Sequence, residues 1–178
     1  MKGTLKVTLG GTVGALSVVL MFLCSLIPFG TFAFPMLAGM LLVVIVIECG
    51  YPWAFSVYGA VSVLSFLLVS DKEAALFYAV FLGYYPIIKS LIERVRSRAL
   101  QIVIKLCVFN AAMIAAFYIG TSLLSVPRES YTLFGVYLPW LFLLLANAVF
   151  LLYDLCISRL AVIYLRRFHD KLKNNTKL

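Results

Sequence analysis

Long runs of uncharged, mostly apolar residues alternate with short polar or proline-containing breaks along this chain. Four stretches contain no Asp, Glu, Lys or Arg, namely residues 7–47, 49–70, 106–127 and 130–153. Each is long enough for at least one helix that crosses a membrane, which takes about 20 apolar residues. Aromatic and β-branched residues are mixed through these stretches without a two-residue alternation. The pattern therefore predicts helices rather than the strands of a membrane barrel.

Prolines, glycines and polar turns divide these stretches into six predicted helices. Residues 28–35 hold two prolines and a glycine, and a Gly-x-Pro turn occupies residues 50–52. Ser70 or Asp71 can cap the fourth helix, since both side chains accept hydrogen bonds from the free N–H groups of a first turn. No breaker occurs in the sixth helix before Asn174, so its basic end is expected to leave the membrane. The predicted helices span residues 8–27, 34–48, 53–69, 73–93, 99–124 and 131–168 of a single transmembrane domain covering 1–178, with a basic tail at 166–178.

The fourth predicted helix has to carry charge within its span. Residues 74–88 are 15 uncharged positions. As a helix they cover about 22 Å of a hydrocarbon core about 30 Å thick. The helix must therefore continue through Lys89 towards Glu93, with Pro86 bending it. Its segment Phe81-Leu82-Gly83-Tyr84-Tyr85-Pro86 indicates a kinked helix packed against a neighbour, and it identifies no ligand.

The composition agrees with a membrane protein. Hydrophobic residues make up 64% of the 178 positions and charged residues 12%, against roughly a quarter charged in soluble domains. Lys2 and Lys6 before an apolar run are also compatible with a secretory signal peptide. That run, however, exceeds a signal core of ~7–15 residues, and no small-residue cleavage site follows Pro28. A first membrane helix is therefore favoured.

Basic residues fall almost entirely on one side of the predicted bundle. Six spans put both ends of the chain on the same side, and 13 of the 15 Lys and Arg belong to it. The other side holds Lys72 and Arg128. By the positive-inside rule the basic side is cytoplasmic, which predicts a multi-pass protein of the cytoplasmic membrane with both termini and the basic tail inside. Attraction to anionic membrane lipids accounts for the net charge of +8 without a nucleic-acid partner.

Five ionisable residues are expected at membrane depth, where a charge is expensive and therefore often functional. They are Glu48, Lys89, Glu93, Lys105 and Asp154. The topology places the first four near the cytoplasmic interface, and Asp154 where the last helix leaves the membrane. A structural layer of ion pairs with snorkelling lysines is favoured over a role in transport.

The opposite, outer half is rich in aromatic residues. Some belong to the first loop and the rest to the last three helices: Phe29, Phe32, Phe34, Tyr78, Tyr118, Tyr131, Tyr137 and Trp140. They fit an interfacial aromatic belt, and they also fit an apolar small-molecule pocket with a few polar handles. Asn110 and Asn147 are the strongly polar, uncharged side chains deep in the last two helices. Hydrogen bonding between helices explains them, with a ligand contact as the alternative.

Small residues crowd the first predicted helix. Gly10 and Gly14 are four residues apart, and so are Gly11 and Ala15. Each pair therefore leaves a flat patch on one face of the helix. Such a patch permits close packing within the bundle or the docking of a separate membrane partner, and both interpretations stay open.

Catalytic and metal-binding motifs are not apparent. The four cysteines are far apart, and the single histidine, His169, belongs to the basic tail. The chain contains no HExxH, no Gly-rich phosphate loop and no paired Asp motif, the patterns on which metal and nucleotide chemistry depends. The sequence therefore predicts a protein that is not an enzyme, with no metal and no cofactor.

Several motifs together suggest a family. The segment Gly11-Thr12-Val13-Gly14-Ala15-Leu16-Ser17-Val18-Val19-Leu20 is followed by Pro28, an aromatic loop and Leu37-Ala38-Gly39. With the chain length and the six-helix layout, this pattern resembles the substrate-binding S component of energy-coupling factor (ECF) transporters of the bacterial inner membrane.

The resemblance implies an ECF S-component-like fold that binds a vitamin or similar micronutrient in its outer half, beneath the first loop. It implies that the first helix docks on a transmembrane T component and that two ATPase subunits drive toppling of the S component. Gly11 and Ala15 match the family's small-xxx-small docking motif, with Gly where the family more often has Ala. The substrate-binding residues that the resemblance implies are Phe29, Phe32, Phe34, Tyr78, Tyr118, Trp140 and Asn147.

Two other functions remain open. A non-catalytic scaffold, similar to the MreD-type membrane proteins of cell-envelope assembly, has a similar size and helix count. It would fill the outer pocket with its own side chains. A membrane enzyme would instead use Lys89, Glu93 and Asp154 in a cleft open to the cytoplasm. The sequence names no ligand.

Overall fold

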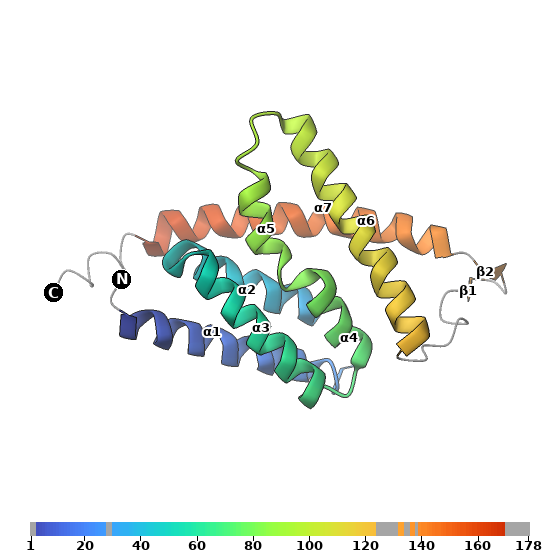
Figure 1. Ribbon diagram of the computed structural model, residues 1–178, viewed down its shortest axis with the longest axis horizontal. Helices are drawn as coiled ribbons and strands as arrows, with labels where there is room; N and C mark the ends of the chain where they lie inside the picture. Colours follow the sequence, from blue (N-terminus) through green and yellow to red (C-terminus); the bar gives the residue numbers. More distant parts are fainter. Residues whose placement is uncertain (1–2, 28–29, 124–131, 134–135, 138, 170–178) are drawn as a thin grey trace.

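The computed structural model describes residues 3–27, 30–123, 132–133, 136–137 and 139–169, which are helical apart from short connections and one two-residue β pair (Figure 1). In chain order the helices are α1 (Gly3–Leu23), α2 (Ala33–Cys49), α3 (Tyr51–Leu68), α4 (Lys72–Phe77), the π-helical η1 (Tyr78–Leu82), α5 (Tyr85–Ile92), α6 (Arg98–Leu123), α7 (Pro139–Tyr164) and the π-helical η3 (Leu165–His169). Strands β1 (Thr132–Leu133) and β2 (Val136–Tyr137) pair antiparallel between α6 and α7. The helical fold class expected from the sequence is confirmed.

Within the described residues, five helical segments are long and apolar enough to cross a membrane. They are Gly3–Leu23, Tyr51–Leu68, Lys72–Ile92, Arg98–Ser122 and Trp140–Arg167. The remaining apolar helix, α2, has 17 residues and a length of about 25 Å. It contacts α1, α3, α5 and α7 and is therefore the central helix of the bundle. The chain is a multi-pass helical membrane protein.

Successive segments run in alternating directions, so α1 begins and α7 ends at the same end of the bundle (Figure 1). We call the side to which these ends belong the terminal side; because the segments alternate in direction, the α2–α3 turn and the α5–α6 connection are assigned to it. Lys6, the basic residues from Lys89 to Lys105 and the arginines late in α7 all belong to the terminal side. Among the described residues, Lys72 is the one Lys or Arg on the opposite side.

Two clusters of buried side chains hold the helices together. The first, around Met21 and Leu42, joins α1, α2, α3 and one side of the fourth segment from Ala74 to Ile87. The second, around Phe81, Tyr85 and Phe150, joins α2, η1, α5, α6 and α7. All five of these side chains are at most 2% exposed. Because α2 contributes to both clusters, it ties the N-terminal three-helix layer to the C-terminal half.

Local sequence explains the connections on both sides of α3. Gly50 adopts a left-handed φ of 86° between α2 and α3, and Pro52 lies in the first turn of α3, where a missing N–H costs nothing. Of the two candidate caps for the fourth segment, Asp71 takes the role and accepts a hydrogen bond from the Ala74 N–H at 3.0 Å. The Thr31 hydroxyl donates to the other Asp71 oxygen at 2.8 Å. The α1–α2 loop is thereby joined to the start of α4.

The last helix begins at Pro139, later than the start near Tyr131 that the apolar run indicated. The β1–β2 pair precedes it. Proline suits a first helical turn, because the N–H it lacks would have no partner there. The first helix is also shifted: it spans 3–23 instead of 8–27. Most of the predicted tail, 170–178, lies outside the described residues.

Candidate functional site

The fourth helical segment is broken in the middle by its own sequence. In η1 the Gly83 N–H donates to the Tyr78 carbonyl, five residues back, at 2.8 Å. That bond takes away the donor that a regular α-helix would give to the Ala79 carbonyl. Four residues after Leu82 comes Pro86, which has no N–H to give. The carbonyls of Ala79 and Leu82 therefore lack the donor that a regular α-helix would give them.

Two tyrosines from other helices supply the missing hydrogen bonds. The Tyr58 hydroxyl of α3 donates to the Ala79 carbonyl at 2.5 Å. The Tyr153 hydroxyl of α7 donates to the Leu82 carbonyl at 3.0 Å. A carbonyl without a donor is unfavourable in a membrane interior, where water cannot supply the missing bond. The break is thus held by α3 on one side and by α7 on the other.

Glycines allow the close approach that the broken segment requires. A side chain at Gly39 in α2 would collide with the Leu82 carbonyl, and it would stand 2.6 Å from the Tyr153 hydroxyl. A Cβ at Gly83 would lie 2.7 Å from the Tyr58 ring and 2.8 Å from the Tyr78 ring. Backbone approaches this close are possible only for glycine. The Gly-Tyr-Tyr-Pro segment therefore packs closely against α2, α3 and α7.

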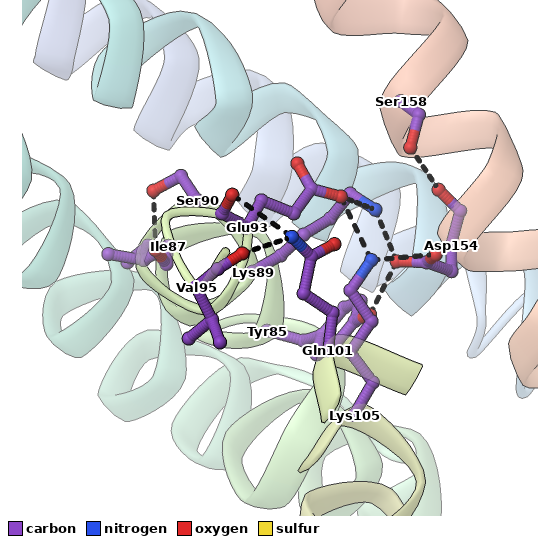
Figure 2. Close-up of polar contacts among 10 residues, drawn as sticks. All are labelled: Tyr85, Ile87, Lys89, Ser90, Glu93, Val95, Gln101, Lys105, Asp154 and Ser158. Atoms are coloured by element: carbon purple, nitrogen blue, oxygen red, sulfur yellow. Dashed lines mark hydrogen bonds and ion pairs between the residues drawn. The ribbon is translucent and has the colours of Figure 1, made fainter. Parts of the chain in front are cut away.

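Four charged side chains next to the break form a closed ring of alternating charge (Figure 2). The Lys89 ammonium contacts Glu93 at 2.7 Å and also Asp154. The Lys105 ammonium contacts Glu93 at 2.9 Å and Asp154 at 3.0 Å. We call these four residues the ion-pair ring. It joins the end of α5, the start of α6 and the middle of α7 through charges that cancel.

The ion-pair ring is buried mainly on its lysine side. Lys89 is 2% exposed and Lys105 8%, while the Glu93 side chain is 41% exposed. The Tyr85 hydroxyl of the broken segment donates to Asp154 at 2.5 Å. Burial raises the pKa of the Glu93 carboxyl, but hydrogen bonds from Lys89 and Lys105 outweigh it and hold that pKa below its ordinary value.

Of the five residues predicted to form an ionic layer, four make up the ion-pair ring. Glu48 lies at the end of α2 and accepts a hydrogen bond from the Tyr164 hydroxyl of α7 at 3.0 Å. Tyr85 is a member of the site that the sequence prediction missed. Its position four residues before Lys89 was the available signal, since that spacing places both side chains on one helix face.

Among the described residues, two adjoining apolar cavities lie between α2, the α4–η1 segment, α6 and α7. Because they share part of their lining, we call them together the cavity. Their volumes are about 260 and 360 Å³. Both are bordered by Phe32, Phe77, Met113, Phe142 and Ala146. The first also contacts Met36, Phe81, Leu82, Phe109, Leu145, Val149, Phe150 and Tyr153, and the second Ile114, Phe117, Tyr118, Trp140 and Leu143.

The structure brings together three of the seven residues expected to bind a substrate. Phe32, Tyr118 and Trp140 border the second cavity. Phe34 packs against the first buried cluster. Tyr78 is completely buried, with its ring centroid 6.1 Å from that of Tyr58. Phe29 lies outside the described residues.

Asn147, the last of the seven, makes its hydrogen bonds with α6 and with its own helix. Its side-chain nitrogen donates to the Asn110 oxygen at 3.0 Å, and the Asn110 nitrogen donates back to the Asn147 oxygen at 3.0 Å. Each nitrogen also donates to the carbonyl four residues earlier, at 2.8 Å. The amide pair therefore holds α6 to α7 with all four of its N–H groups used.

The small residues of α1 divide into two faces. Gly10 and Gly14 face α3, where an added Cβ would lie 3.3 Å or 3.6 Å from the Val57 side chain. Gly11 and Ala15 are exposed on another face, and nothing lies within 4 Å of a Cβ built on Gly11. One small pair thus packs inside the bundle, and the other is left on its surface.

Fold and site together define a multi-pass helical membrane protein with an ion-pair ring on its terminal side and an apolar cavity towards the opposite side. Within the described ranges, no three His, Cys, Asp or Glu residues lie together as metal ligands would. Comparison with protein-family models, with curated proteins and with solved structures finds no match to this chain.

Proposed function

We propose that this chain is the substrate-binding subunit of an ECF-type uptake transporter, as its sequence resemblance implies. It binds a small molecule in the apolar cavity and docks on a T component through α1. The observation that carries the proposal is the cavity itself. It lies towards the side opposite the termini, next to the start of α2, with Phe32, Tyr118 and Trp140 on its border.

The surface of α1 supports the docking part of the proposal. Gly11 and Ala15 are exposed and four residues apart, so a partner helix can approach the α1 backbone closely. The neighbouring Gly10 and Gly14 are already used by α3. Gly11 and Ala15, unlike Gly10 and Gly14, therefore do not pack against α3.

The orientation of the protein is part of the same proposal. The described basic residues cluster on the terminal side, so the positive-inside rule puts both termini in the cytoplasm. The cavity then lies in the outer half of the bundle, where an uptake system receives its substrate. Cysteine accessibility can test this point: a Cys placed at Arg96 should react with an impermeant thiol reagent only from the cytoplasmic side.

Co-purification tests the proposed function. The chain is expressed with the T component and the two ATPase subunits of the same genome, and the complex is isolated in mild detergent. Replacing Gly11 and Ala15 together by Leu should abolish association with the T component. Replacing Ala111 and Ala115 by Leu is the matched control, because this pair is also exposed and four residues apart on α6. Association that survives the α1 changes, or no association of the unaltered chain, would refute the proposal.

A non-catalytic membrane scaffold, similar to the MreD-type proteins, is the second candidate. The favouring observation is that the polar groups near the cavity bond to one another, as the asparagine pair does. A scaffold needs no ligand, so native mass spectrometry of the purified chain should then find no bound small molecule. A molecule bound in stoichiometric amount would contradict the scaffold.

A further inference from the structure

We infer that the molecule held in the cavity is uncharged and mainly apolar, such as a small aromatic or isoprenoid compound. This inference rests on the proposed function and specifies its substrate class. Every described residue that lines the cavity is apolar or aromatic, and the polar side-chain atoms of these residues are two tyrosine hydroxyls and one indole N–H. A charged substrate would be buried there without a partner among the described lining residues, which is strongly unfavourable.

The Tyr153 hydroxyl on the cavity lining and two amides next in sequence to lining residues are already engaged elsewhere. The Tyr153 hydroxyl donates to the Leu82 carbonyl at 3.0 Å. The amides of Asn110 and Asn147 are paired with each other and with their own helices. A polar substrate would have to break these bonds to use these three groups. An apolar substrate leaves them intact, so the cavity selects for it.

A layer of aromatic rings separates the cavity from the ion-pair ring. Phe81, Phe109 and Phe150 border the cavity, and the last two stack with ring centroids 4.5 Å apart. Behind them Tyr85 stacks on Phe81 at 4.8 Å and donates its hydroxyl to Asp154. The four charges of the ring neutralise one another on the far side of this layer. They therefore offer no counter-ion to a charged substrate.

The rim of the cavity borders the surface that faces lipid. Tyr118 on α6 is 64% exposed, and Trp140 and Leu145 on α7 are 75% and 53% exposed. Exposed apolar surface on a membrane-spanning helix contacts lipid chains. An apolar substrate that partitions into the bilayer can therefore enter from the side. The volumes of about 260 and 360 Å³ lie at the small end of ligand pockets, which suits a compact ring system.

A matched pair of fluorescent probes tests the inference. N-phenylnaphthylamine is neutral, and anilinonaphthalene sulfonate has the same rings with a negative charge. The chain is placed in lipid nanodiscs with Trp53→Phe, so that Trp140, on the cavity border, is the one remaining tryptophan. We expect saturable energy transfer from Trp140 to the neutral probe. Binding of the sulfonate should be weaker by roughly tenfold or more. Empty nanodiscs report the lipid background.

Variants of α7 locate the binding. Ala146 borders both cavities, so Ala146→Phe fills them and should abolish saturable transfer. Ala148→Phe, on the exposed face two residues away, should leave transfer unchanged. Should Ala146→Phe fail to fold, comparing the neutral and the charged probe on the parent chain still tests whether the cavity prefers an uncharged molecule.

Three outcomes would overturn the inference. Equal or tighter binding of the sulfonate is one, and displacement of the neutral probe by benzyltrimethylammonium at lower concentration than by naphthalene is another, because aromatic cages also bind cations. The third is absence of saturable transfer. None of these results touches the co-purification with the T component, so failure of the substrate class and failure of the proposed function are distinguishable.

Discussion

Tyr153, which donates a hydrogen bond to the broken fourth segment, provides the sharpest test of the structure. In Tyr153→Phe the ring stays and the hydroxyl that donates to the Leu82 carbonyl is lost. Pro86 has no N–H, so the carbonyl lacks the donor that a regular α-helix would supply. Tyr153 is 2% exposed, and water cannot easily replace the lost bond. A buried acceptor left without a partner costs about 1–3 kcal/mol.

That loss should appear as a lower melting temperature, by about 2–4 °C per kcal/mol for a chain of this size. A thiol-reactive fluorogenic dye can follow unfolding, because Cys24 and Cys49 are buried. The exposed Cys107 and Cys156 are first replaced by Ser. Tyr118→Phe is the matched control, since this tyrosine is 64% exposed and its hydroxyl should contribute little.

A second substitution identifies the mechanism. Pro86→Ala restores a backbone N–H four residues after Leu82. In the Tyr153→Phe background it should recover part of the lost stability, and in the parent chain it should gain less. Equal melting temperatures for Tyr153→Phe and Tyr118→Phe would refute the reasoning. So would a Pro86→Ala effect that is the same in both backgrounds.

Three further predictions use the same assay. Lys89→Met removes one of the two positive charges that contact Asp154, so it should lower the free energy of unfolding by about 3 kcal/mol. Combining Lys89→Met with Asp154→Leu should lower it clearly less. Equal losses of stability in the two variants would contradict the pairing. Since the pKa of Glu93 is held below its ordinary value of 4.5, its stabilising effect is full above that value and is lost as the pH falls through the lowered pKa. The stability difference between the parent chain and Glu93→Gln should therefore shrink between pH 7 and pH values near 3, and a constant difference would argue against an ionised Glu93. Gly39→Ala should destabilise the protein by about 2 kcal/mol or more, because the added Cβ meets the Leu82 carbonyl. Gly59→Ala is the control: with open space around its Cβ, it should be neutral or stabilising by up to about 1 kcal/mol. Similar effects of both substitutions would disprove the close approach of α2 to the Leu82 carbonyl.

Features that depend on neighbours in the chain could be predicted from the sequence. The apolar runs and their breaks predicted the helical segments in order, and the Asp71 cap and the Gly50 turn followed from local hydrogen bonding and backbone freedom. Lys89 and Glu93, expected in one ionic layer, are four residues apart, a spacing that places both side chains on one helix face, and they are paired in the structure. The start of α7 was predicted too early, because the apolar run continues through the residues before Pro139.

Which faces of the helices meet was decided by the tertiary structure alone. These helices are apolar on all sides, so hydrophobic periodicity cannot show which face points inward. The sequence could therefore propose Asn147 as a ligand contact, while packing turned its amide towards Asn110. In the same way, the assembly of Lys105 and Asp154, 49 residues apart, into one ring needs the crossing of α6 and α7. A charge in a membrane requires a partner, but only the packed bundle determines which one it receives.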